Sequence, residues 1–176
     1  LPAIYSDNMV IQRDKPFVVE GTANAGSKVV VKLGKQKRTV KVPDNGSWRV
    51  SFEPMKADGK SLKMVVECEE EKRVYENIVV GEVWLCSGQS NMAFMVKESS
   101  HKGKSLANVN GKDIRLYNMK PRVITDNVEW DSIDLVRLNR HDYYLPTEWQ
   151  MQDEKNVSDF SAVAYHFGAM LADSLG

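Results

Sequence analysis

Residues 78–92 read IVVGEVWLCSGQSNM, and they separate two parts of the chain that follow different sequence patterns. From Ile78 to Cys86 nearly every residue is apolar, which is typical of a strand buried on both faces of a parallel sheet covered by helices. The apolar run then gives way to small and polar residues around Gly88. We therefore expect an α/β region to begin in this stretch.

The sequence before this stretch predicts an all-β module. Short apolar or alternating runs are separated by turn residues, a spacing typical of an antiparallel β-sandwich. The predicted strands are residues 17–20, 29–33, 38–42, 48–52 and 62–67, with a turn at 43–46 and a charged hairpin at 69–73. The first domain is therefore predicted to span residues 1–78.

Residues 79–176 are predicted to form the second, α/β region. Ile114 to Tyr117 is a second strand candidate. Residues 160–175 place apolar side chains at helical spacing, with Ser158 or Asp159 as the expected cap of that helix. The intervening polar stretches predict long irregular segments.

Composition excludes several classes of function. The chain has 24 Lys plus Arg and 24 Asp plus Glu, so no basic field attracts nucleic acid. No run approaches the roughly 20 apolar residues that a membrane helix needs. The three histidines are far apart and no C-x-x-C motif occurs, so no metal site is expected. Cys68 and Cys86 are either bridged or two free thiols.

The turn that follows the apolar run has the features of a nucleophile site. Gly88 permits a tight turn, and Ser90 stands where the chain is expected to enter a helix. A serine there has its hydroxyl at the carboxyl end of a strand, where ligands bind in open α/β sheets. Its backbone N–H is placed to stabilise an oxyanion, as acyl transfer requires. A serine in this position also caps helices without catalysing anything.

Three segments resemble the sialate O-acetylesterase family, within the SGNH-type hydrolases. Residues 81–92 (GEVWLCSGQSNM) look like the family's nucleophile block. Residues 1–13 (LPAIYSDNMVIQR) are similar to the opening of its N-terminal β-sandwich, and residues 160–167 (FSAVAYHF) to a helix that leads to its next core strand. The resemblance, weakest over 97–149, implies a β-sandwich followed by the start of a flavodoxin-like, three-layer α/β hydrolase domain that is incomplete in this chain.

The resemblance implies a carboxylic ester hydrolase. Ser90 would be the nucleophile and an oxyanion donor, while Gly88, Gln89 and Asn91 match the family's motif and would shape the turn. The implied reaction removes acetyl groups from O-acetylated sialic acid through an acetyl-enzyme, without a cofactor, in a periplasmic or secreted protein. An acetylated xylan is the alternative substrate, and a non-catalytic carbohydrate-binding or interaction module is the alternative function.

The catalytic base has no match in this sequence. In the family an Asp-x-x-His segment near the C-terminal end supplies it, and further oxyanion donors follow from later glycine and asparagine residues. We expect His101 in a solvated loop, His141 in a loop beside Asp142, and His166 on a helix. Little turnover is therefore expected from these 176 residues alone, and the remainder of the hydrolase domain is an expected partner.

The four tryptophans are candidates for stacking on a sugar ring, because flat aromatic faces suit such rings. Trp48 and Trp84 lie in strand patterns, so both are expected in the core. Trp130 and Trp149 lie in the irregular stretch and are open candidates for binding a sugar ring.

Overall fold

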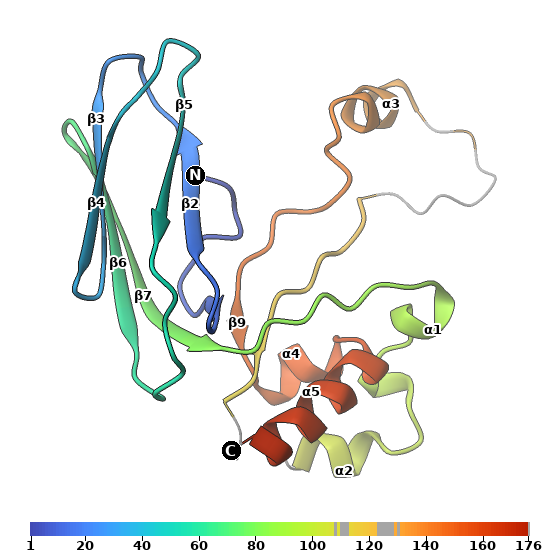
Figure 1. The fold of residues 1–176 in the computed structure, drawn as a ribbon. Helices are drawn as coiled ribbons and strands as arrows, with labels where there is room; N and C mark the ends of the chain where they lie inside the picture. Colours follow the sequence, from blue (N-terminus) through green and yellow to red (C-terminus); the bar gives the residue numbers. More distant parts are fainter. Residues whose placement is uncertain (108, 110–112, 123–128, 130, 176) are drawn as a thin grey trace.

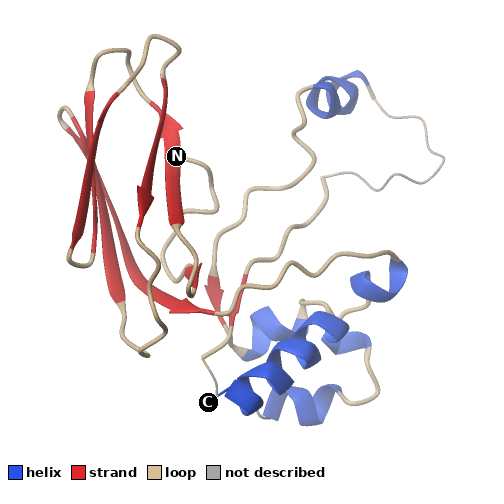
Figure 2. Cartoon of the chain, viewed as in Figure 1, coloured by secondary structure: helices blue, strands red, loops and turns tan. Residues whose placement is uncertain are grey.

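The computed structural model describes residues 1–107, 109, 113–122, 129 and 131–175. A β-rich region lies on one side of the molecule and a cluster of short helices on the other (Figures 1 and 2). The first region contains β1 (Val10–Gln12), β2 (Phe17–Thr22), β3 (Lys28–Leu33), β4 (Gln36–Lys41), β5 (Ser47–Phe52), β6 (Leu62–Cys68) and β7 (Glu71–Gly81). The second contains α1 (Ser90–Ala93), the 3-10 turn η1 (Val96–Glu98), α2 (Lys102–Ala107), β8 (Arg115–Leu116), α3 (Ser132–Asn139), β9 (Gln150–Met151), α4 (Glu154–Ser158) and α5 (Ala162–Leu175).

The β-rich region consists of two sheets that share one hydrophobic core. One sheet has the strand order β1-β7-β6-β3-β4, and the other pairs β2 with β5. Val19 and Phe52 from the small sheet belong to the same buried cluster as Val31, Met64 and Ile78 from the large one. The alternation of apolar and polar residues buries one face of each strand. The strands and the hairpin predicted before residue 78 are confirmed, whereas the short β1 was not predicted.

The strand predicted over residues 78–86 is correct only in its first part. β7 ends at Gly81, and from Val79 to Gly81 it pairs in parallel with β1, inside the β-rich region. Beyond Gly81 the chain leaves the sheet, and Leu85 is 88% exposed. A strand needs hydrogen-bonded neighbours, and among the described residues none pairs with residues 83–86. The expected helix-covered strand at 82–86 is therefore wrong for this structure.

The second region has its own small core around α5. Val96, Leu116, Val157 and Tyr165 are buried in it, and α5 confirms the helix predicted over residues 160–175. The predicted second strand is confirmed as β8, but β8 pairs antiparallel with β9. The described part of this region contains no parallel pair of strands, so the flavodoxin-like sheet stays a prediction. The boundary expected at residue 78 falls inside β7 and also stays a prediction.

The start of α5 differs from the sequence prediction. α4 occupies residues up to Ser158, and Asp159 closes that helix. The first turn of α5 is capped instead by Ser161, whose Oγ accepts the Ala164 N–H at 3.3 Å. The cap expected at Ser158 or Asp159 is therefore wrong, because those residues end the preceding helix.

One buried arginine joins the two regions. The Arg115 side chain is 3% exposed. Its guanidinium donates hydrogen bonds to the Asn8 carbonyl at 3.2 Å, to the Asn77 carbonyl, and to Asp113 Oδ1 at 3.1 Å. Asn8 and Asn77 both have left-handed backbones, with φ of 64° and 54°. The end of β8 is therefore fixed against the start of the β1–β7 pairing.

Candidate functional site

Ser90 is the first residue of α1, and its side chain is exposed. The Gln89 carbonyl accepts the Met92 N–H at 2.9 Å and the Ala93 N–H at 3.1 Å, which closes the turn behind the serine. The helix predicted to begin at Ser90 is thus present, although it has a single turn. The exposed hydroxyl is accessible to a substrate from solvent.

Gly88 closely approaches Met92 in this turn. A Cβ placed on Gly88 would lie 3.1 Å from the Met92 Cβ. A side chain at this position would require Met92, in α1, to shift by a few tenths of an ångström. The role of Gly88 in shaping the turn stays a prediction. Gln89 and Asn91 flank the serine and are exposed.

The start of α5 holds the chain immediately after the serine. The Phe94 carbonyl accepts the Ala162 N–H at 2.8 Å, and Val96 donates its N–H to the Phe160 carbonyl at 3.0 Å. Ser161 Oγ lies 3.2 Å from Met92 Sδ. The segment 160–167 is therefore in direct contact with the segment that carries Ser90.

A surface ion pair reinforces this contact. Lys97 Nζ lies 2.8 Å from Asp159 Oδ1. The hydrogen bond from the ammonium group, together with its charge, holds the pKa of the Asp159 carboxyl below its ordinary value. The same bond raises the pKa of Lys97. Both groups therefore stay charged at neutral pH, and the pair links η1 to the end of α4.

None of the three histidines contacts Ser90 in the described part of the chain. His101 Nδ1 lies 3.1 Å from Ser100 Oγ, and the His141 ring stacks on Tyr143 at a centroid distance of 5.8 Å. His166 is exposed on α5, with Nε2 3.5 Å from Ser105 Oγ. Each histidine thus has its neighbours elsewhere, and the residues that the structure describes bring no base to the serine.

The tryptophans differ in their placement. Trp48 is 5% exposed in β5, as expected, but Trp84 is 58% exposed, so its predicted place in the core is wrong. Trp84 lies beyond the end of β7, and its ring contacts Phe167 edge-on at 5.2 Å. Trp149 is half-buried and donates its Nε1–H to the Ile4 carbonyl at 3.0 Å. Trp130 lies outside the described residues.

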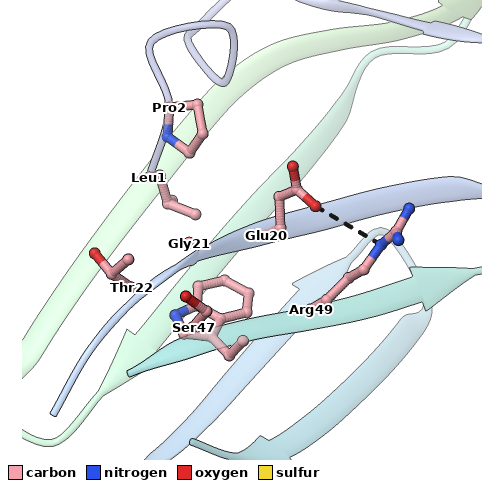
Figure 3. A pocket seen from close by; sticks show the side chains of 8 residues that line it. Leu1, Pro2, Glu20, Gly21, Thr22, Ser47 and Arg49 are labelled. Carbon is pink, nitrogen blue, oxygen red and sulfur yellow. Dashed lines mark ion pairs between the residues drawn. The ribbon is translucent and has the colours of Figure 1, made fainter. Parts of the chain in front are cut away.

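Other candidate sites are absent from the described residues or lie away from Ser90. Cys68 and Cys86 are free thiols. The described residues contain no cluster of three or more potential metal ligands, and no described helix is long and apolar enough to cross a bilayer. A hollow of about 680 Å³ lies on β2 and β5 (Figure 3), lined by Leu1, Pro2, Glu20, Gly21, Thr22, Ser47, Trp48 and Arg49.

Sequence comparison relates the chain to carbohydrate esterases. Over 98% of its length it is 29% identical to the sialate O-acetylesterase of Rattus norvegicus and 30% identical to that of Mus musculus. The human sialate O-acetylesterase is 28% identical over 97% of the chain. The chain spans about a third of the length of these relatives. No model of a known protein family matches it.

Structure comparison supports the same relationship at the level of fold. A carbohydrate acetylesterase from Xanthomonas citri superimposes with a TM-score of 0.78 over 99% of this chain and 37% of its own length, at 24% sequence identity. The resemblance predicted from residues 1–13, 81–92 and 160–167 is therefore confirmed by homologues that cover almost the whole chain.

Proposed function

We propose that this chain, a homologue of the sialate O-acetylesterases along nearly its whole length, carries the nucleophile of a carbohydrate O-acetylesterase. The observation that carries the proposal is the position of Ser90. Ser90 is exposed and is the first residue of a helical turn, two residues after the close-packed Gly88. It also lies in the segment that resembles the family's nucleophile block.

The proposed reaction begins with attack of Ser90 Oγ on the acetyl carbonyl carbon. The sugar hydroxyl leaves, an acetyl-enzyme forms, and water then releases acetate and restores the serine. The backbone N–H of Ser90 is proposed as one donor to the oxyanion. That N–H forms no hydrogen bond with another described residue, as expected for the first residues of a helix. The N–H groups of Met92 and Ala93 are already used by Gln89.

We propose that the general base comes from polypeptide outside these 176 residues. A serine hydroxyl needs a base to remove its proton as it attacks. The three histidines described here lie against other groups, and the relatives are about three times as long as this chain. An Asp-x-x-His segment of the family's type is the proposed source.

We also propose that the remainder of an SGNH-type α/β domain covers an exposed apolar strip beside Ser90. The strip consists of Val83, Trp84 and Leu85 together with Val163, Phe167 and Met170 on one face of α5, and each is more than a third exposed. The Trp84 ring contacts Phe167 at a centroid distance of 5.2 Å, which joins the two groups. Contiguous apolar side chains of this kind mark surfaces that bind other protein elements.

The strip predicts self-association of the chain when it is produced alone. Leu85→Asp adds a charge at the most exposed apolar position and is expected to weaken this association at least tenfold, because association would then bury a charge. Sedimentation velocity over a concentration series measures it. Leu135→Asp on α3 is the matched control, since that exposed leucine lies outside the strip. The proposal is contradicted if the chain stays monomeric at about 100 μM. Any self-association would then have an affinity no better than about millimolar.

The substrate is tested by acetate release from two defined esters. We expect the natural polypeptide that carries these residues to release acetate faster from O-acetylated sialic acid than from acetylated xylan, because its homologues are named sialate O-acetylesterases. A higher kcat/KM on xylan would assign the alternative substrate. Binding of either sugar without acetate release would favour the non-catalytic module.

The predicted periplasmic or secreted location remains a proposal. Immunodetection of the protein in fractionated cells and medium tests it. Recovery in the cytoplasmic fraction alone would contradict it.

A further inference from the structure

We infer that Gln12 and Arg13 are positioning residues for the segment that leads to Ser90. The inference rests on the proposed function for the role of Ser90 itself, but its geometry is independent of that role. β1 and β7 pair in parallel through Val10–Val79, Ile11–Val80 and Gln12–Gly81, and the pairing of strands stops there. Beyond that point, the side chains of Gln12 and Arg13 and the backbone N–H of Arg13 continue the contacts between the two segments.

Four contacts join these two residues to the end of β7 and the residues after it. The Arg13 N–H donates to the Gly81 carbonyl at 2.9 Å. Gln12 Oε1 accepts the Val83 N–H at 2.8 Å, and Gln12 Nε2 donates to Glu82 Oε2 at 3.1 Å. Arg13 Nε lies 2.6 Å from Glu82 Oε1. The Glu82 carboxylate is thus held by both residues.

The Gln12 amide acts here as a substitute for a peptide group. A glutamine side chain offers one carbonyl acceptor and N–H donors, as a backbone peptide does. The backbone itself cannot continue the pairing, because Asp14 has a left-handed φ of 58° and donates its N–H to the Met55 carbonyl at 2.8 Å. The side chain therefore extends the hydrogen-bonded register by two residues, to Val83.

Val83 and Phe94 are the two fixed ends of the segment that carries Ser90. Phe94 is fixed by its bond with Ala162. Between the two ends, residues 84–88 form no backbone hydrogen bond with the described chain, and Trp84 has the ring contact with Phe167. The position of Ser90 thus depends on both ends. Small displacements of a reacting group lower catalytic rates strongly, since near-attack geometry is lost.

A plain surface ion pair does not account for this arrangement. Arg13 and Glu82 have side chains that are 39% and 27% exposed, and such pairs contribute little to stability. The bond between Gln12 and the Val83 N–H needs no charge, and it fixes the backbone of the segment directly. Gln12 is therefore the residue on which the inference is tested.

The test compares Gln12→Ala with Gln36→Ala. Gln36 Oε1 accepts the Glu53 N–H at 3.0 Å, so the control loses the same kind of bond at an exposed site elsewhere in the β-rich region. Amide exchange followed by NMR is expected to speed up about three- to tenfold at Val83 in Gln12→Ala, the loss of one ordinary hydrogen bond. If the segment moves as inferred, exchange at Met92 and Ala93 also rises, and Gln36→Ala leaves all three amides unchanged.

A charge swap provides a rescue that a purely structural role would not predict. Gln12→Glu alone places two carboxylates together and is expected to accelerate exchange as Gln12→Ala does. Adding Glu82→Gln removes this repulsion and restores an N–H donor between the two side chains. The carboxylate at position 12 can then accept the Val83 N–H, so protection should return. In the natural polypeptide, Gln12→Ala is expected to lower kcat about tenfold on an acetyl ester while KM changes less than twofold.

The outcomes separate this inference from the proposed function. Unchanged exchange at Met92 and Ala93 in Gln12→Ala would overturn the positioning role. Faster exchange there, reversed by the charge swap, supports it even if the unmodified polypeptide has no turnover that depends on Ser90. In that last case the proposed function fails and the positioning of the segment stands.

Discussion

Ser90→Ala is expected to lower the rate of acetyl ester hydrolysis by at least about a thousandfold, because alanine leaves no atom that can form the acetyl-enzyme. The measurement is acetate release, or release of p-nitrophenol from its acetate, by the natural polypeptide that carries these residues. Ser90 is exposed, and its side chain forms no hydrogen bond with a described residue. The variant should therefore unfold at the same temperature as the unmodified protein, within about 2 °C.

Ser87→Ala is the matched control for this experiment. Ser87 is also exposed and lies three residues earlier in the same segment. Its variant should keep activity within about threefold, a difference that corresponds to less than 1 kcal/mol in the barrier. Equal rates for the unmodified protein and Ser90→Ala would remove Ser90 from the reaction. A loss in Ser87→Ala as large as that in Ser90→Ala would show that the segment, and not one hydroxyl, had been disturbed.

The β-rich region was predictable because its pattern is local. In β5 the side chains of Trp48, Val50 and Phe52 are buried while the residues between them are exposed. A period of two over six residues is enough to identify such a strand. β1 was not predicted, because it has only three residues and its pairing partner, β7, lies far along the chain.

The stretch 82–86 shows where local pattern fails. Its apolar composition predicts burial, but burial needs neighbours, and composition does not reveal them. Trp84 and Leu85 are exposed for this reason.

The turn at Ser90 could be predicted because Gly88 marks it in the sequence. The contacts that fix the turn were not, since Gln12 and Ala162 are about 70 residues away from their partners Val83 and Phe94.

The three segments that resemble the esterase family form one connected unit in space. Residues 1–13 provide Gln12 and Arg13, which hold Glu82 and Val83. Residues 160–167 provide Ala162, which holds Phe94. The segment with Ser90 lies between them. The two ends of this segment are thus held by different regions of the fold.

Arg115→Met is expected to destabilise the protein by about 3 kcal/mol. Methionine fills similar space but leaves the carbonyls of Asn8 and Asn77 without their donor in a site where the arginine side chain is 3% exposed. Unsatisfied buried acceptors each cost about 1–3 kcal/mol. Urea denaturation followed by circular dichroism measures the free energy of unfolding.

Arg137→Met controls for the loss of a positive charge. Arg137 on α3 is 47% exposed and pairs with Asp134 three residues earlier, so its replacement should cost less than about 0.5 kcal/mol. The free energy of unfolding of Arg115→Lys should lie between those of the other two variants, since a lysine keeps the charge but cannot form the planar set of bonds to both carbonyls.

The unmodified protein should unfold in one transition. Arg115→Met should also unfold in one transition but at a lower urea concentration, because it removes the buried donor that joins β8 to the β1–β7 pair. A free energy within 0.5 kcal/mol of the unmodified value, still in one transition, would show that Trp149 and the remaining contacts join the regions without Arg115.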